Sequence, residues 1–174
     1  HLILDEVATG FGRTGTMFAM EQARHARPDF LCISKGLTSG TLPLAATLTT
    51  RDVFDCFLGP EGSGKTFYHG HTFTANPPGC AAALASLDLF EEDDTLENVA
   101  ERSPELHRGL EKLKDLPHVG DVRGLGMMGA VELVKDKKSK EPLPSGHELL
   151  RDIYRLGLER NVILRPIGHI VYLY

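Results

Sequence analysis

Two short apolar runs near the start of the sequence each lead to a charged residue. Residues 2–4 (LIL) lead into Asp5, and residues 30–33 (FLCI) lead through Ser34 to Lys35. Such runs suit buried strands, and burying an unpaired charge costs free energy. If the two strands are parallel neighbours, both charges lie at one edge of the sheet, where open α/β folds bind ligands. The pattern therefore predicts a site with a carboxylate and an amine.

The segment between these runs predicts a β-loop-α-β unit. Residues 8–15 (ATGFGRTG) form a glycine-rich loop, and residues 17–25 have a helical pattern that Pro28 interrupts. Such a unit crosses over right-handed into a parallel pair of strands. Residues 1–5 then form a buried strand, and residues 42–50 (LPLAATLTT) predict a further one.

The rest of the chain alternates helical patterns with short strands. Asn76-Pro77-Pro78 opens a helix that continues to Phe90, because proline is tolerated in a first helical turn. Amphipathic patterns predict helices over residues 96–113 and 147–159. The other predicted segments are a loop at 59–65, two short strands within 118–134, an exposed loop over 135–145, and strands at 162–164 and 170–173.

The composition changes near residue 93, from strands and glycine-rich loops to helices and a hairpin. We therefore predict an α/β chain with one domain over residues 1–92 and a second, truncated one over residues 93–174. Both ends of the sequence fall inside apolar runs. The chain is therefore expected to be a fragment of a longer protein.

The composition narrows the possible partners and compartments. The net charge of -5 gives no reason to expect nucleic acid or an anionic membrane as partner, and no apolar run approaches the ~20 residues of a membrane span. Cys32, Cys56 and Cys80 have neither metal-type nor disulfide-framework spacing, and the histidines form no metal set. A reducing, cytoplasmic location is the expectation.

A carboxylate and an amine at one sheet edge suit pyridoxal 5'-phosphate (PLP). The lysine would form the Schiff base, and the acid would keep the pyridine nitrogen protonated so that the ring accepts electrons. Four motifs then occur in order: LILDEVATGFGRTG, ISKGLTSGTLPLAATLTT, FYHGHTFTANP and ILRPIG. With them the chain resembles the class III, fold-type-I PLP aminotransferases over essentially its whole length.

The resemblance implies a fold and a set of site residues. Residues 1–92 would be the C-terminal part of the large PLP-binding domain, and residues 93–174 the small C-terminal α+β domain. Asp5 is similar to the family's pyridine-nitrogen aspartate, Lys35 to its Schiff-base lysine, and Val7 to the apolar residue on the ring face. Lys35 would also carry the proton from the donor carbon.

Further residues match the family's phosphate and substrate positions. Thr72 resembles the threonine that reaches the phosphate of the neighbouring subunit's cofactor, which implies a homodimer with a shared active site. Gly70 and His71 would line the pocket, although a plain polar turn competes with this role for His71. Arg165 resembles the arginine that binds the substrate carboxylate. For Arg13, a structural pairing is as good an explanation as substrate contact.

Within the family, ATGFGRTG, AATLTT, GHTF and LRPIG most resemble the 8-amino-7-oxononanoate aminotransferases of biotin synthesis. These make 7,8-diaminononanoate with S-adenosylmethionine or, in a subgroup, lysine as amino donor. GKTFYHGHTFTANPPGCAAAL, LPHVGDVRGLG and KEPLP favour the lysine-using branch without settling the donor. Pyruvate-dependent omega-amino acid or amine transaminases, which share SKGLTSG, are the alternative within the family.

Two interpretations outside this family compete with it. Residues 59–66 (GPEGSGKT) match the phosphate-binding loop of nucleotide hydrolases, which works only where a helix begins at the Lys-Thr pair. The sequence after Thr66 has no helical period, which argues against ATP binding. Gly10, Gly12 and Gly15 also fit a dinucleotide-binding spacing, but no acidic ribose ligand follows. The second interpretation is an inactive fragment that serves only as an interaction module.

Overall fold

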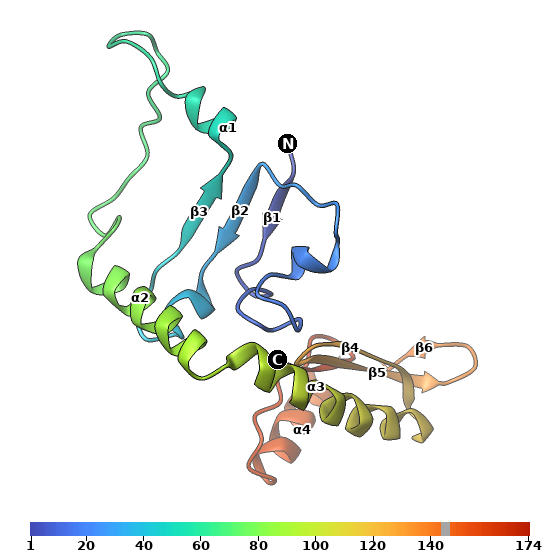
Figure 1. The fold of residues 1–174 in the computed structure, drawn as a ribbon. Helices are drawn as coiled ribbons and strands as arrows, with labels where there is room; N and C mark the ends of the chain where they lie inside the picture. Colours follow the sequence, from blue (N-terminus) through green and yellow to red (C-terminus); the bar gives the residue numbers. More distant parts are fainter. Residues whose placement is uncertain (144–146) are drawn as a thin grey trace. The chain divides into compact units, whose positions relative to one another are not determined.

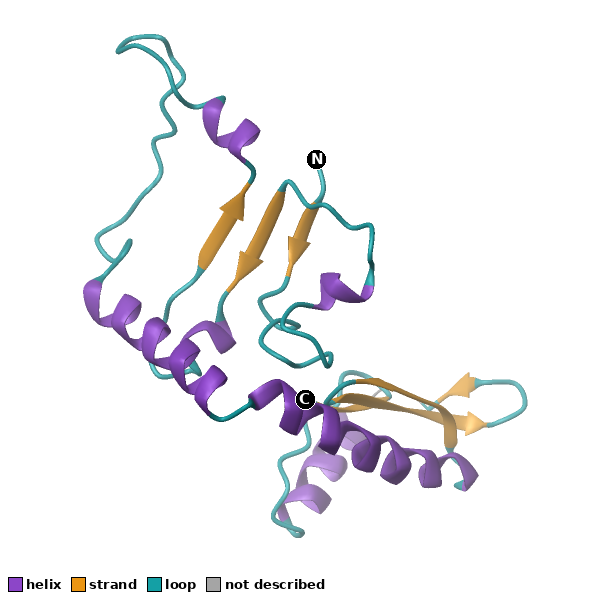
Figure 2. Cartoon of the chain, in the orientation of Figure 1, coloured by secondary structure: helices purple, strands orange, loops and turns teal. Residues whose placement is uncertain are grey.

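A computed structural model of the chain describes residues 1–143 and 147–174. The described residues form two compact units. Unit 1 comprises His1–Gly12 and Thr16–Leu96, and unit 2 comprises Arg13–Gly15 and Glu97–Tyr174. Figure 1 traces the chain through both, and Figure 2 separates its helices, strands and loops. Among the helices of the described residues, none is long and apolar enough to cross a membrane.

Unit 1 contains a three-stranded sheet, β1 (Ile3–Asp5), β2 (Phe30–Ile33) and β3 (Ala46–Thr49). β1 and β2 are parallel, with Asp5 opposite Cys32, whereas β3 is antiparallel to β2. The predicted parallel pair is therefore confirmed. The prediction of a buried first strand is wrong, since the Ile3 side chain is 62% exposed. Within the described residues β1 is an edge strand with a neighbour on one side only.

The short helices of unit 1 differ from the predicted ones. The helix expected over residues 17–25 is a single 3-10 turn, η1 (Ala19–Gln22). A short apolar pattern does not offset the cost of nucleating a longer helix. Two further turns were not predicted: η2 (Lys35–Thr38) and α1 (Arg51–Asp55), where the Thr50 side chain accepts from the Val53 N–H.

The long helix of unit 1 and the core it covers follow from the sequence. α2 (Pro77–Glu92) is confirmed, and the Asn76 side chain caps it by accepting from the Gly79 N–H at 2.8 Å. Ala83 of α2 packs with Ile33 and Leu37 in a core that Phe11, Phe18, Leu31 and Leu44 extend. This core lies directly beneath the turn after β2.

Unit 2 combines helices with an antiparallel sheet. Its elements are α3 (Thr95–Glu111), η3 (Lys112–Asp115), β4 (Val119–Leu125), β5 (Met128–Asp136), β6 (Glu141–Pro142), α4 (His147–Leu158) and β7 (Ile170–Leu173). β5 pairs with β4, β6 and β7. Leu110 of α3 packs on Val122 and Val131, and Gly129 permits this because a Cβ there would lie 2.4 Å from the Leu110 side chain. The predicted hairpin, the α3 and α4 helices and the last strand are confirmed.

Two predictions for unit 2 need correction. Residues 162–164 are not a strand, because the Val162 N–H donates to the Gly157 carbonyl and so closes the end of α4. The loop predicted over residues 135–145 begins within β5 and contains β6. Residues 144 and 145 of that loop lie outside the described residues.

Candidate active site

Asp5 is the last residue of β1, and Lys35 lies two residues beyond the end of β2. Because β1 and β2 run parallel, both residues lie at the same edge of the sheet. Figure 2 shows the two strands side by side. Asp5 and Lys35 are both exposed. One Asp5 carboxylate oxygen, Oδ1, accepts from the Val7 N–H at 3.0 Å, which orients the carboxylate at the start of the glycine-rich loop. Val7 itself is partly buried beside it. The structure therefore places both Asp5 and Lys35 at one edge of the sheet.

The turn that carries Lys35 is held from several sides. Lys35 has a φ of 36°, in the left-handed region that favours glycine, and such backbone is retained where surrounding contacts fix it. The Ser34 hydroxyl donates to the Leu44 carbonyl at 2.7 Å, and the Thr38 hydroxyl donates to the Leu42 carbonyl at 2.6 Å. Ser86 of α2 donates to the Gly36 carbonyl at 3.4 Å. A strained lysine on a braced turn is typical of a functional position.

Glu6 is a residue that the sequence reasoning missed. Its side chain is 3% exposed, and its carboxylate accepts from the N–H groups of Ala19 (3.1 Å) and Met20 (2.8 Å) and from the Thr9 hydroxyl. The sequence carries no local signal for this burial, because Glu6 lies just beyond the end of β1 and its N–H donors are 13 and 14 residues further along the chain.

Gly70, His71 and Thr72 lie in the long connection between α1 and α2, which projects from the sheet in Figure 1. All three are exposed. The hydrogen bonds described for them stay local: the His71 N–H donates to the Thr74 hydroxyl at 3.0 Å, and the Phe73 N–H donates to His71 Nδ1 at 3.1 Å. The hydrogen bonds described for these three residues therefore do not connect them to Asp5.

The two predicted arginines belong to unit 2. Arg165 is exposed in the coil between α4 and β7. The Arg13 guanidinium lies 4.6 Å from the centroid of the Tyr174 ring, and its carbonyl accepts from the Met127 N–H at 2.9 Å. Arg13 thus has a structural partner in the Tyr174 ring, as the structural alternative for this residue expected.

The structure contradicts the nucleotide-hydrolase interpretation. Residues 59–66 form exposed loop and turns, and no helix begins at Lys65. The next helix along the chain starts at Pro77. The amide cradle of a phosphate-binding loop requires the helix N-terminus at the Lys-Thr pair, so the sequence match alone cannot hold a triphosphate.

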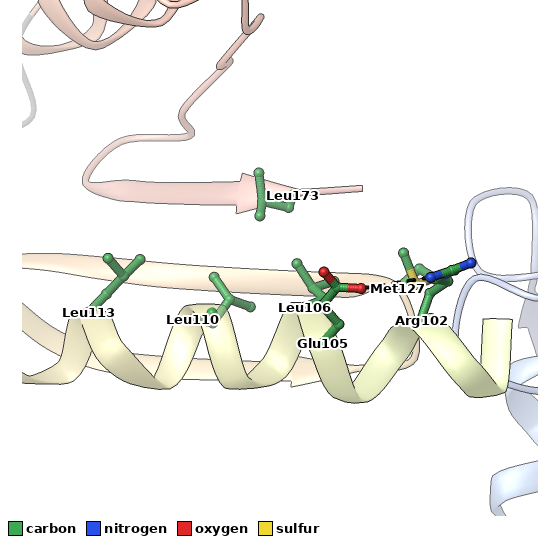
Figure 3. Close-up of a pocket in the computed structure, with 8 residues that line it drawn as sticks. Arg102, Glu105, Leu106, Leu110, Leu113, Met127 and Leu173 are labelled. Carbon is green, nitrogen blue, oxygen red and sulfur yellow. Dashed lines mark ion pairs between the residues drawn. The ribbon is translucent and has the colours of Figure 1, made fainter. Parts of the chain in front are cut away.

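Unit 2 contains an open groove of about 550 Å³ beside α3. Figure 3 shows Leu106, Leu110 and Leu113 of α3 and Leu173 of β7 along it. Its polar side chains, Arg102 and Glu105, are within salt-bridge distance of each other, at 4.0 Å. None of the predicted site residues lines this groove, so its chemistry is that of a packing surface.

Comparison with known proteins supports the predicted family. Residues 1–174 match the family described as aminotransferase class-III. Over 174 aligned residues the chain is 51% identical to the adenosylmethionine-8-amino-7-oxononanoate aminotransferase of Methanocaldococcus jannaschii. The alignment covers 98% of this chain and 38% of that protein. The protein of the same name from Aquifex aeolicus is 52% identical over 172 aligned residues. That alignment covers 99% of this chain and 38% of that protein. The chain thus spans less than half the length of these relatives.

Solved structures agree in fold. The crystal structure of the Methanocaldococcus jannaschii enzyme superposes with a TM-score of 0.92 at 50% identity, over 98% of this chain and 40% of that one. An (S)-enantioselective omega-transaminase from Thermomicrobium roseum superposes with a TM-score of 0.90 at 37% identity, over 99% of this chain and 38% of that one. With sequence, fold and motif order in agreement, this chain belongs to the class-III aminotransferase family.

Proposed function

We propose that the complete protein is a PLP-dependent aminotransferase that converts 8-amino-7-oxononanoate to 7,8-diaminononanoate in biotin synthesis. The observation that carries this proposal is the identity of about half of all aligned residues to relatives bearing that name. The chain spans 38% of those relatives, so other parts of the protein must complete the site. The cytoplasm is the proposed location.

The residues at the sheet edge fit PLP. The fit rests on the donor set, a carboxylate and an amine on adjacent parallel strands, with the amine on a braced turn. Asp5 would accept a hydrogen bond from the pyridine nitrogen and keep it protonated, and Val7 would pack on the ring face. When bound, PLP supplies an electron-accepting ring. Units 1 and 2 would then belong to the large and small domains of the enzyme.

Lys35 would perform two tasks. Its Nζ would hold PLP covalently and, once the amino donor displaces it, would move the proton at the donor carbon. The bracing of the turn by Ser34, Thr38 and Ser86 supports this role, because a proton carrier must stay within reach of the reacting atom. The reaction would be ping-pong, so the deaminated donor would leave before 8-amino-7-oxononanoate binds.

Phosphate and substrate would be held by residues from the other predicted positions. We assign the phosphate contacts to the Thr72 hydroxyl and His71, and the pocket lining to Gly70. Arg165 would bind the substrate carboxylate bidentately, with Arg13 as a second candidate. The exposure of the connection that carries Thr72 supports a contribution in trans, to the site of a second copy in a homodimer. Residues 1–174 alone are therefore expected to bind PLP weakly and not to turn over.

One experiment tests the cofactor and the donor together. The full-length protein is loaded with PLP, and S-adenosylmethionine, lysine or an omega-amine is added in separate samples. Conversion of bound PLP to pyridoxamine phosphate identifies the donor, and mass spectrometry of the product after adding 8-amino-7-oxononanoate identifies the acceptor. Absence of bound PLP overturns the proposal.

A second candidate function is an omega-amine:pyruvate transaminase, which the superposition on the Thermomicrobium roseum enzyme favours. It predicts conversion by the omega-amine with pyruvate, and no 7,8-diaminononanoate. Within the first proposal, the same experiment decides whether the amino donor is lysine or S-adenosylmethionine.

A further inference from the structure

Glu6 is a buried carboxylate to which none of the roles above is assigned. It is 3% exposed, and both of its oxygens are occupied: Oε1 accepts from the Met20 N–H, while Oε2 accepts from the Ala19 N–H and the Thr9 hydroxyl. A carboxylate taken out of water persists only where such donors replace its hydration. Glu6 therefore has hydrogen-bond donors of the protein in place of the water that it lost on burial.

These contacts close the glycine-rich loop onto the end of β1. The two N–H donors lie in η1, 13 and 14 residues further along the chain, so one side chain ties the start of η1 to the end of β1. The backbone of Glu6 takes part as well: its N–H donates to the Cys32 carbonyl of β2 at 2.9 Å, and its carbonyl accepts from the Gly10 N–H at 3.0 Å. Glu6 thus fixes the strand end that presents Asp5.

The closed loop also reaches the turn that carries Lys35. A Cβ placed on Gly36 would lie 2.7 Å from the Phe11 side chain, so Phe11 rests directly on the residue after Lys35. Phe11 is held in turn by its N–H, which donates to the Met17 carbonyl at 2.6 Å, and by edge-on contact with the Phe18 ring at 5.7 Å. Contacts thus run from Glu6 through the loop to Gly36.

We propose that Glu6 is a positioning residue that sets Asp5 and Lys35 relative to each other through the glycine-rich loop, with Phe11 as the contact on the Lys35 turn. The proposal rests on the function proposed above. The physical reason is that Lys35 has a left-handed backbone that needs external support, and Phe11 packs against the next residue. Displacing a reacting group by about 1 Å costs on the order of 100-fold in rate.

The test uses the full-length, PLP-loaded enzyme with Glu6→Gln, which keeps the shape of the side chain but leaves one oxygen to serve three donors. We expect kcat per bound PLP to fall roughly 10- to 100-fold with little change in KM, because the displacement affects the reacting amine more than substrate binding. We also expect the pH midpoint of the visible absorbance of bound PLP to shift, since it reports the surroundings of Lys35 and Asp5. A purely structural role would lower Tm and leave kcat per bound PLP and the midpoint unchanged.

Glu21→Gln is the matched control. Glu21 is exposed in η1, the turn whose first N–H groups Glu6 accepts, and its own carboxylate accepts from the Phe18 N–H at 3.0 Å. The same substitution there should leave kcat and the midpoint unchanged. If Glu6→Gln does not fold, Phe11→Leu decides: a shifted midpoint and lower kcat support the proposal, and wild-type values overturn it. A folded Glu6→Gln enzyme with wild-type kcat and midpoint also overturns it. Wild-type enzyme without PLP on Lys35 overturns the proposed function instead.

Discussion

Two regions of unit 1 carry predicted cofactor residues, and they are built differently. The sheet edge with Asp5 and Lys35 is tied to distant parts of the chain by buried Glu6 and by the contact of Phe11 with Gly36. The segment over residues 59–75, with Gly70, His71 and Thr72, is exposed throughout. Within the described residues, its hydrogen bonds join positions two or three apart.

The difference teaches where each part of the site acquires its geometry. The backbone at the sheet edge is held by hydrogen bonds and packing within this chain. The segment over residues 59–75 presents large apolar side chains to solvent, among them Tyr68 at 92% exposure and Phe73 at 72%. Such a cluster is typical of a surface that a partner covers, and we expect a second copy of the protein to fix its final arrangement.

The largest expected effect comes from Lys35. Lys35→Ala in the full-length enzyme should remove the covalent attachment of PLP. It should also lower turnover by ~10²- to 10⁴-fold or more, because positioned acid–base catalysis alone contributes that much. Borohydride reduction followed by peptide mass mapping locates the attachment. Lys65→Ala, at the exposed lysine of the phosphate-loop match, should leave both properties unchanged. Retained transamination by Lys35→Ala would break the assignment of the sheet edge.

Thr72 tests the exposed segment. Thr72→Ala should weaken PLP affinity roughly 10- to 100-fold, because a hydrogen bond to a charged group is worth about 1.5–3 kcal/mol, whereas Thr72→Ser should retain most of it. Equilibrium dialysis of PLP measures the difference.

Mixing subunits shows whether Thr72 acts in trans. A dimer of one Lys35→Ala and one Thr72→Ala subunit contains one intact site if Thr72 serves the neighbouring copy, and none if it serves its own. Recovery of activity on mixing is therefore the expected result. If activity does not recover although the mixed dimers form, the segment belongs to the site of its own subunit.

A pair of apolar substitutions compares the stability of the two regions. Leu37→Ala, in the core beneath the Lys35 turn, should cost about 2–5 kcal/mol of unfolding free energy. Phe67→Ala, at a side chain 63% exposed, should change the stability of a subunit by no more than about 0.5 kcal/mol. Denaturant unfolding measures the first quantity, and the dimer dissociation constant shows whether Phe67 is buried by a partner. If Leu37→Ala and Phe67→Ala lowered the unfolding free energy equally, the two regions would not differ in packing as described.

The smallest expected effect lies in unit 2. The Arg123 side chain donates to Asp121 at 2.7 Å, and this hydrogen bond lowers the pKa of Asp121 from its ordinary value of 3.8. The stabilisation is present above pH 3.8 and is lost as the pH falls through the lowered pKa. Because both side chains are 49% exposed, it should amount to about 0.2–1 kcal/mol and shrink with salt. Asp121→Asn should flatten this part of the stability–pH curve.

Local patterns in the sequence predicted local structure well. The Asn76 cap with prolines behind it specified the start of α2, and glycines between apolar runs specified the β4–β5 hairpin. Where a pattern was short, tertiary contacts decided instead. The helix predicted over residues 17–25 is only the single turn η1, and its first N–H groups, those of Ala19 and Met20, donate to Glu6. Val162 closes the end of α4 and does not join a sheet.

The sequence by itself determined that an acid and an amine end adjacent parallel strands, because the alternation of apolar and charged positions is a local property of a strand. It also placed the chain in its family through the order of four motifs. Only the tertiary structure decided that Glu6 is buried, that Phe11 rests on Gly36 and that Arg13 meets Tyr174. Those contacts join residues distant in the chain, and their geometry depends on the packing of whole elements, which no short stretch of sequence encodes.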